Sequence, residues 1–290
     1  MIWDTLPTAL VIYAFVFSAA YVAFSSARLE KRTKRAIHSV IAPERSAPVH
    51  YISFDQFSSL PPPVARYLRL ALNPGSRAPQ RVRLSQDGEM RLMYGYKSWK
   101  WFSARGYFRV GSPAYVWDAR VDMMPIADAR VVDNYLHGRA ALRVKLMSSL
   151  PLFEDEGRPE LAQSALVRYL AEAVWCPTIL LPCARLEWQA IDDDSARATL
   201  TDSGLSVSLV FHFNARNEVE RVVADERFRE LDGRFVPTRW TAYYKGYADC
   251  GDMHIPLQFA AQWNLSDEDF TYWRGRLRSI EYDPQPTVWE

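Results

Sequence analysis

Two side chains of opposite charge lie four residues apart in the segment SALVRYLAEAVWCPTILLP, which spans residues 164–182. Arg168 and Glu172 share one face of the helix that this segment predicts, and Trp175 follows about one turn later. Pro177 then ends the helical path. Three kinds of chemistry fit an arginine and a glutamate at this spacing: a reacting pair, a clamp on a ligand, or a structural brace.

Apolar residues occupy most of the remaining surface of this predicted helix. We therefore expect the Arg168–Glu172 pair to be partly enclosed. An enclosed ion pair commonly fixes the register of packed elements, and a pair without a nearby nucleophile is poorly suited to catalysis. The spacing favours the brace, and it leaves the ligand clamp and the reacting pair open.

Local signatures of common catalytic chemistry are missing from the sequence. It contains no GxxxxGK[ST], GxGxxG, HExxH or GxSxG, the motifs of nucleotide binding, zinc-dependent hydrolysis and acyl transfer. Asp118 and Asp122 share a face of a predicted strand, but four residues of strand separate them by roughly 13 Å, which is too far for a carboxylate dyad. We predict no catalytic residue and no cofactor.

The segment DCGDMHIP is the strongest candidate for a metal site. Asp249, Asp252 and His254 lie close together in it, next to Cys250. Aspartate and glycine are also the residues that tight turns use, because their side chains and backbone suit the required conformations. We therefore predict a turn here and no metal.

The composition narrows the classes of function. The 290 residues carry a formal net charge of +1, which argues against a nucleic-acid partner because such proteins present a basic face. The three cysteines form no CxxC pattern, so neither a zinc site nor a disulfide framework is predicted. The 10 Trp, 15 Tyr and 14 Phe either fill a large core or line an apolar cavity.

The N-terminal segment is apolar. Residues 6–24 carry no charge, and as a helix they would be about 28 Å long, close to the hydrocarbon thickness of a bilayer. We predict a single-pass transmembrane anchor over residues 1–27 and a basic juxtamembrane linker over residues 28–53. Five basic residues between positions 28 and 35 place the domain on the cytoplasmic side of the cytoplasmic membrane by the positive-inside rule, with a periplasmic or extracellular domain as the alternative.

Strand patterns dominate the rest of the chain. Helices are predicted near 61–73 and 160–175, while elsewhere the hydrophobic period is two, as in the segment LSVSLVFHF before a turn at 214–217. The fold class is therefore mainly antiparallel β (α+β). We predict one domain over residues 54–285, a curved sheet or half-barrel of about ten strands with one or two packed helices, plus the N-terminal transmembrane helix.

Several predicted strands carry aromatic residues on both faces. A sheet with one face in water keeps that face polar, so both faces of this sheet are covered or the sheet encloses a cavity. A cavity would draw its ligand contacts from the aromatic and charged residues of these strands and of the second helix. The residues that we expect to contact a ligand are Trp117, Asp118, Arg120, Arg168, Glu172, Trp175, Trp188, Trp240, Trp263 and Tyr272.

Five sequence blocks carry a resemblance to a known family. SLPPPVARYLRLAL, PAYVWDARVDM, VRYLAEAVWCPTILLP, LEWQAIDDDSARATL and DFTYWRGRLRSIEYD occur in this order between Phe54 and Asp283. Together they resemble an uncharacterised bacterial domain family of unknown function, often with one N-terminal membrane span. The order of strands and helices is similar to the lipoprotein-carrier (Lol-type) half-barrels, in which a curved sheet wraps helices over an apolar cavity. The resemblance implies no catalytic residues.

The leading functional hypothesis is a membrane-anchored protein that binds an apolar or lipid-like small molecule without covalent chemistry. One alternative is an enzyme with scattered catalytic residues, which would bring Asp118, Arg120, Arg168 and Glu172 together around one cleft. Another alternative is a structural partner of a membrane complex, which would need a broad exposed apolar patch rather than a cavity. The sequence identifies no protein partner.

Overall fold

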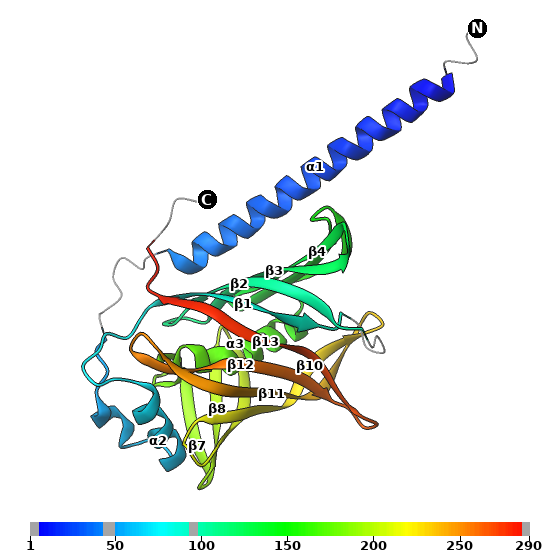
Figure 1. The fold of residues 1–290 in the computed structure, drawn as a ribbon. Helices are drawn as coiled ribbons and strands as arrows, with labels where there is room; N and C mark the ends of the chain where they lie inside the picture. The colour runs from blue at the N-terminus through cyan, green and yellow to red at the C-terminus, as the bar shows by residue number, and fades with distance from the viewer. Residues whose placement is uncertain (1–5, 43–49, 93–97, 286–290) are drawn as a thin grey trace.

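The computed structural model describes residues 6–42, 50–92 and 98–285. Within these ranges thirteen strands form one antiparallel sheet, which curves around a helix (Figure 1). The strands, in order across the sheet, are β6 (Leu150–Glu156), β5 (Arg139–Leu146), β4 (Ala127–Leu136), β3 (Ala114–Met124), β2 (Lys100–Arg109), β1 (Arg81–Met90), β13 (Asp269–Tyr282), β12 (Met253–Asn264), β11 (Arg234–Cys250), β10 (Val219–Leu231), β9 (Leu205–Phe213), β8 (Ser195–Asp202) and β7 (Leu186–Asp192).

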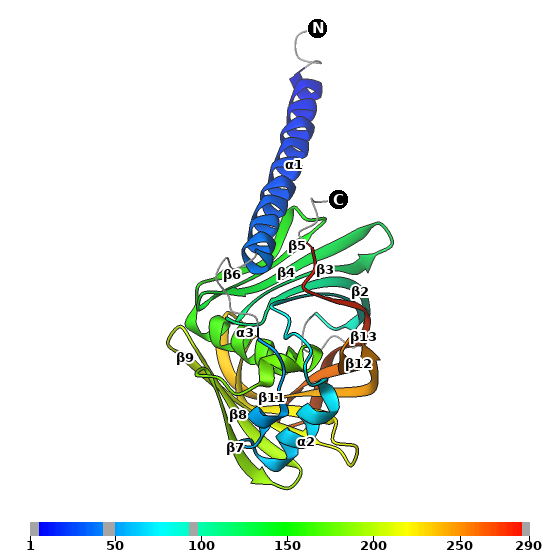
Figure 2. The same cartoon turned by 90° about the vertical axis from the view of Figure 1, so that its left-hand side faces the viewer.

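The chain builds this sheet in two halves. Strands β1 to β6 pair in sequence order on one side and β7 to β13 on the other, and the pairing of β1 with β13 joins them. Helix α3 (Pro159–Ala171) and the 3-10 turns η2 (Glu172–Trp175) and η3 (Pro177–Leu180) connect the edge strand β6 to the edge strand β7. This connection crosses the concave side of the sheet, so α3 contacts strands of both halves (Figure 2).

The helices begin where the sequence supplies proline. Both α2 (Pro62–Ala71) and α3 have proline in the first turn, where a missing N–H costs no hydrogen bond. Helix α3 buries most of its surface, including Leu166 and Leu170, in the core inside the curve of the sheet. Helix α2 follows the 3-10 turn η1 (Phe54–Phe57) and packs near β8 and β12.

The strand predicted for LSVSLVFHF and the turn predicted at 214–217 are confirmed, and they belong to a hairpin. Strands β9 and β10 pair antiparallel, with Val219 opposite Phe213. Asn217 lies in the turn with a φ of 59°, in the left-handed region. Asparagine tolerates this conformation better than most residues, because its short polar side chain bonds locally.

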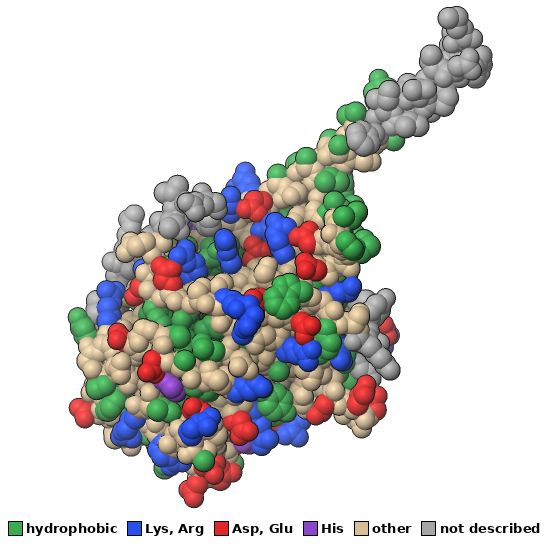
Figure 3. Space-filling view, viewed as in Figure 1, with side chains coloured by type: hydrophobic (Ala, Val, Ile, Leu, Met, Phe, Trp, Pro, Cys, Tyr) green, Lys and Arg blue, Asp and Glu red, His purple; other side chains and the backbone are tan. Residues whose placement is uncertain are grey.

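Helix α1 (Leu6–Ile41) is a single long helix that packs on the convex face of the sheet with its C-terminal part. Leu29, Ile37 and Val40 are buried against a cluster from β2, β3 and β4, and Ser25 Oγ donates a hydrogen bond to Ser149 O at 2.7 Å. The N-terminal part leaves the body of the domain (Figure 1). Its apolar side chains, such as that of Phe17, are exposed, while charged side chains of both signs cover the body (Figure 3).

The prediction of a transmembrane anchor is wrong. No helix in the described ranges is both long enough and apolar enough to cross a membrane. The single-pass placement in the cytoplasmic membrane, and the cytoplasmic side assigned to the domain, were inferred from that anchor and are corrected with it. From Ser25 onward, α1 instead uses its side chains to pack on the sheet.

The predicted fold class needs further corrections. The sheet has thirteen strands rather than about ten, and three α-helices accompany it within the described residues. The edge strands explain part of the difference in number. Strand β6 has no buried residue and β7 buries only Leu186, so neither shows the alternation by which strands are recognised.

We expect Gly88→Ala to lower the free energy of unfolding by about 1–3 kcal/mol or more, as overpacking does. Gly88 faces Gly275 where β1 meets β13, and a Cβ at Gly88 would lie 2.1 Å from Arg274 O. The contact is with backbone, so it cannot be relieved by a rotamer change. Urea unfolding measures the effect, and Gly111→Ala is the control because a Cβ there meets nothing within 4 Å. Equal stability of the two variants would refute the close approach.

Candidate ligand-binding site

A cavity of about 280 Å³ lies between α3 and the concave face of the sheet. Leu161 and Ala165 of α3 form one side, and strands from both halves of the sheet form the rest. The wall is mostly apolar, and its aromatic members include Trp117, Trp240, Tyr244, Trp263, Tyr272 and Trp273. A concave, mainly apolar space with a few polar groups is the usual form of a small-molecule site.

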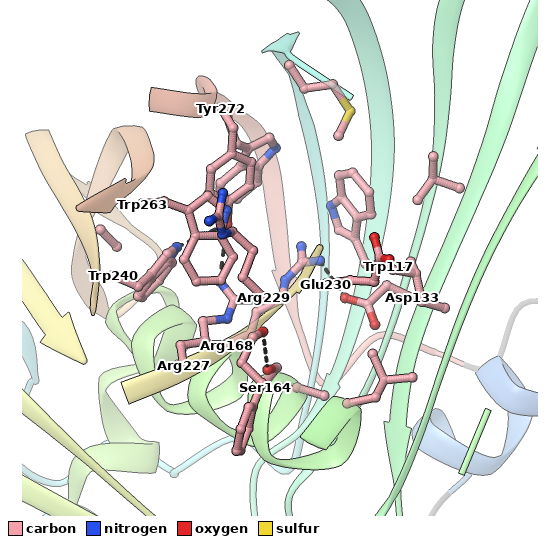
Figure 4. Close-up of a pocket in the computed structure, with 18 of the residues that line it drawn as sticks. Trp117, Asp133, Ser164, Arg168, Arg227, Arg229, Glu230, Trp240, Trp263 and Tyr272 are labelled. Atoms are coloured by element: carbon pink, nitrogen blue, oxygen red, sulfur yellow. Dashed lines mark hydrogen bonds and ion pairs between the residues drawn. The ribbon is translucent and has the colours of Figure 1, made fainter. Parts of the chain in front are cut away.

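A buried charge cluster lies on one side of this cavity (Figure 4). Arg168 Nε donates to Glu172 Oε1 at 2.6 Å, and Arg168 Nη1 donates to Asp133 Oδ2 at 2.8 Å. Tyr115 OH donates to the same oxygen of Asp133 at 3.0 Å. The Glu172 side chain is 4% exposed and those of Arg168 and Asp133 are 13% and 14% exposed. The arginine therefore ties α3 to β4 and to η2.

Aromatic rings enclose the Arg168 guanidinium. Its central carbon lies 4.7 Å from the centre of the Trp117 ring and 5.5 Å from those of Tyr115 and Trp273. Trp117 is itself fixed, because its Nε1 donates to Gln86 Oε1 at 3.0 Å. Cation–π contacts are stronger in such a desolvated place than at the surface. Three aromatic rings thus surround the guanidinium of the charge cluster.

Glu172 carries the excess negative charge of this cluster. Burial raises the pKa of Glu172, and the Arg168 guanidinium opposes that shift without cancelling it. Only Arg168 forms ion pairs with the two carboxylates, although the charge of Arg227 also lowers the pKa of Glu172. Among the described residues, Glu172 Oε2 has no hydrogen-bond partner. A buried carboxyl in this position retains its proton to higher pH than a solvated one.

A second polar group lies on the other side of the cavity (Figure 4). The Arg227 guanidinium stacks on two rings, at 4.6 Å from the Trp240 centre and 5.4 Å from the Trp263 centre. Arg227 Nη1 donates to Tyr272 OH at 3.1 Å, and Trp240 Nε1 donates to the same hydroxyl at 3.0 Å. We call Arg227, Trp240, Trp263 and Tyr272 the Arg227 cage.

Some of the residues predicted to contact a ligand line the cavity, and the others do not. Those that line the cavity are Trp117, Arg168, Glu172, Trp240, Trp263 and Tyr272. Trp175 lies behind the wall, fully buried against Phe259 and Trp273. Trp188 is further away, where its Nε1 donates to Leu180 O at 3.0 Å.

Asp118 and Arg120 lie on the opposite face of β3 from Trp117. Asp118 accepts two hydrogen bonds from Arg130, which also binds Glu30 of α1 at 2.6 Å. Arg120 is exposed and pairs with Asp128. Neighbouring residues of a strand point to opposite faces, so these two do not join the Arg168–Glu172 pair around one cleft.

The cavity residues that the sequence analysis missed include Asp133, Arg227 and Trp273. Asp133 lies 35 residues from Arg168 in the chain, so no local spacing links the two. Arg227 follows an irregularity in the pairing of β10 with β11, between Ala224 and Arg227. Such bulges redirect side chains, and simple alternation along β10 does not predict them.

The DCGDMHIP segment forms the turn between β11 and β12. His254 Nδ1 lies 2.6 Å from Asp249 Oδ1 on the surface. Over the described ranges, no three His, Cys, Asp or Glu side chains gather in a way that could hold a metal ion. The candidate site is therefore the cavity between α3 and the sheet, where the predicted aromatic and charged residues converge.

Comparisons with known proteins place the chain in a family. A LolA superfamily protein from Nitrosomonas europaea is similar in structure, with 7% identity and a TM-score of 0.42 over 77% of this chain and 93% of that one. A DUF1329 family protein from Desulfovibrio piger has 10% identity and a TM-score of 0.40 over 79% of this chain and 92% of that one. Likeness at this level carries no inference about a ligand. No curated protein matches the sequence. The model of a family of unknown function, DUF6920, matches residues 58–282, which confirms the resemblance of the sequence blocks, and the chain belongs to this family.

Proposed function

We propose that the protein binds an apolar or lipid-like small molecule in the cavity between α3 and the sheet, without covalent chemistry. The observation that carries this proposal is the mostly apolar, aromatic wall of a space of about 280 Å³ inside the core. Small-molecule sites usually measure roughly 300–1,000 Å³. The volume therefore suits one compact apolar body or a single chain, rather than several acyl chains together.

The polar groups of the cavity support binding better than catalysis. Among the described lining residues there is neither histidine nor cysteine. Ser164 is fixed by the hydrogen bond that its Oγ donates to Phe228 O at 2.7 Å. The charges of Arg168, Glu172 and Asp133 are largely occupied with one another. An activated nucleophile needs an adjacent base within hydrogen-bond reach, and these residues do not supply such a pair.

Calorimetric titration of the full chain with dodecanol tests this proposal. The probe is neutral, so its binding reports on the apolar cavity alone. We expect saturable binding at one site, and we expect Ala165→Trp to weaken it at least about tenfold, because the new ring fills the space next to Leu161. Glu160→Trp is the control, since it adds the same ring to α3 at a residue that does not line the cavity.

Circular dichroism establishes that both variants are folded. Ala165→Phe replaces Ala165→Trp if the larger ring prevents folding. Wild-type protein that takes up no dodecanol would overturn the proposal. So would binding that neither cavity substitution weakens.

A further inference from the structure

Arg227 differs from the most buried arginines in the partners of its charge. Arg130, Arg143 and Arg168 each hold two carboxylates, and their side chains are 8%, 9% and 13% exposed. Arg227 is partly buried, lines the cavity, and forms no ion pair with a carboxylate in the described part of the chain, although its charge lowers the pKa of Glu172. Glu226, which directly precedes Arg227 in β10, is exposed. Glu230 lines the cavity but is also exposed, and it accepts a hydrogen bond from the backbone N–H of Gly233. A buried or half-buried cation normally has a compensating anion.

The hydrogen-bond capacity that remains in the Arg227 cage consists of donors. Tyr272 OH accepts from both Arg227 and Trp240. A phenolic oxygen has two lone pairs and one proton, so the proton of Tyr272 is left to donate. Arg227 Nε, and Trp273 Nε1 elsewhere in the cavity wall, are buried and lack an acceptor among the described residues. This group of donors is complementary to a ligand atom that only accepts.

Aromatic cages often bind cationic ligands, but this one is already occupied by the protein's own cation. Trp240 and Trp263 are stacked on the Arg227 guanidinium. A second cation would meet its repulsion rather than the free faces of the rings. The remaining preference is for an anion, which the planar guanidinium can bind through two parallel N–H groups.

We infer that the Arg227 cage binds the anionic head group of a single-chain amphiphile, a carboxylate or a phosphate, while the chain occupies the apolar part of the cavity. This inference rests on the proposed function and names the ligand class. The competing feature is Glu172, whose Oε2 has no hydrogen-bond partner in the part of the chain that the structure describes and would favour a ligand that donates. A cationic amphiphile is therefore the critical comparison.

Four amphiphiles with matched alkyl chains and different head groups distinguish an anionic ligand from a neutral or a cationic one. The 290-residue chain is titrated near neutral pH with dodecanoate, dodecyl phosphate, dodecanol and dodecyltrimethylammonium, each below its micelle concentration. We expect one or both anions to bind about ten to a hundred times more tightly than dodecanol, as charge-assisted hydrogen bonds do. The tighter of the two anions shows whether the head group is a carboxylate or a phosphate. Dodecyltrimethylammonium is expected to bind no better than dodecanol.

Substitution of Arg227 assigns the effect to the cage. Arg227→Met retains an apolar stem between the rings, so it should remove the advantage of the anions and leave dodecanol binding unchanged. Arg227→Lys should retain part of the tighter binding of the anions. Lysine keeps the positive charge but lacks the paired N–H donors of the guanidinium. Arg239→Met is the matched control: the same charge is lost one residue before Trp240, at an exposed side chain that does not line the cavity.

The binding results distinguish a failure of the head-group inference from a failure of the proposed function. If none of the four ligands binds, the cavity proposal itself fails. If dodecanol binds and the anions bind no more tightly, or if Arg227→Met leaves their advantage intact, the cavity proposal stands and the head-group inference is overturned. Preferential binding of the cationic amphiphile would also overturn it and would point to Glu172 instead.

Discussion

Arg168→Met is expected to lower the free energy of unfolding by about 3–5 kcal/mol, the cost of removing one partner from a buried ion pair. The substitution leaves the carboxylates of Glu172 and Asp133 without their shared cation, in a place where both side chains are less than 15% exposed. Methionine has a comparable stem, so the loss comes mainly from the two stranded carboxylates. Chemical denaturation at neutral pH measures it.

Substitution of Glu172 should be less costly than substitution of Arg168. Glu172→Leu leaves one cation facing one carboxylate, since the Arg168–Asp133 contact at 2.8 Å remains. The double variant Arg168→Met, Glu172→Leu should lose less than the sum of the single losses, because only Asp133 is then unpaired. A triple variant that also carries Asp133→Asn should be more stable than this double variant.

An exposed ion pair provides the control for this series. Arg197 lies 3.9 Å from Asp225 with side chains 38% and 63% exposed, so Arg197→Met should cost no more than about 1 kcal/mol. If the losses at Arg168 and Glu172 are additive, the brace interpretation is wrong. If stability is unchanged while dodecanol or dodecanoate binding is lost, the pair is a ligand clamp.

The spacing of Arg168 and Glu172 was sufficient to predict their contact but not the cluster that surrounds them. A helix brings residues four apart onto one face by its own geometry, and the two side chains do form an ion pair. Asp133 reaches Arg168 from β4 only because α3 crosses the concave side of the sheet. Long-range contacts of this kind depend on the fold as a whole, so local spacing does not reveal them.

Strand periodicity explains where the structure places three of the residues predicted to contact a ligand. In the structure Trp117 lies on the cavity face of β3, and alternation along the strand requires Asp118 and Arg120 to face the other way. Both belong to the residues that the sequence analysis predicts to contact a ligand. Arg227 could not be found by alternation, because the irregularity in β10 lies directly before it.

Helix α1 shows how an apolar segment can mislead. The transmembrane prediction rests on the absence of charged residues from positions 6–24, and it assigns the basic residues after them to a linker. Leu29, Thr33, Ile37 and Val40 recur at helical spacing and are all buried, so the helix continues to Ile41 and packs on the sheet. This amphipathic stripe is visible in the sequence, but the surrounding lysines and arginines conceal it when charge is considered alone.

Trp175→Ala is the second substitution with a large expected effect, a loss of about 3–5 kcal/mol in the free energy of unfolding. Trp175 is 1% exposed. Its ring meets Phe259 and Trp273 edge-on, at 5.3 Å and 6.4 Å between centres, and both of these rings line the cavity. Alanine would leave a void behind the cavity wall and remove the hydrogen bond that Trp175 Nε1 donates to Pro256 O at 3.1 Å.

Two further variants separate the contributions of the Trp175 ring and its N–H. Trp175→Phe keeps an aromatic ring and loses the donor, so it should cost clearly less than alanine, about 1–3 kcal/mol for the unpaired carbonyl and the smaller ring. Trp101→Ala, at a side chain 46% exposed on β2, should change stability by no more than about 0.5 kcal/mol. Because Trp175 supports the wall without touching the space inside, Trp175→Phe should also bind dodecanol like the wild type. A folded Trp175→Phe variant that loses dodecanol binding would instead show that Trp175 contacts the ligand, as the sequence predicts.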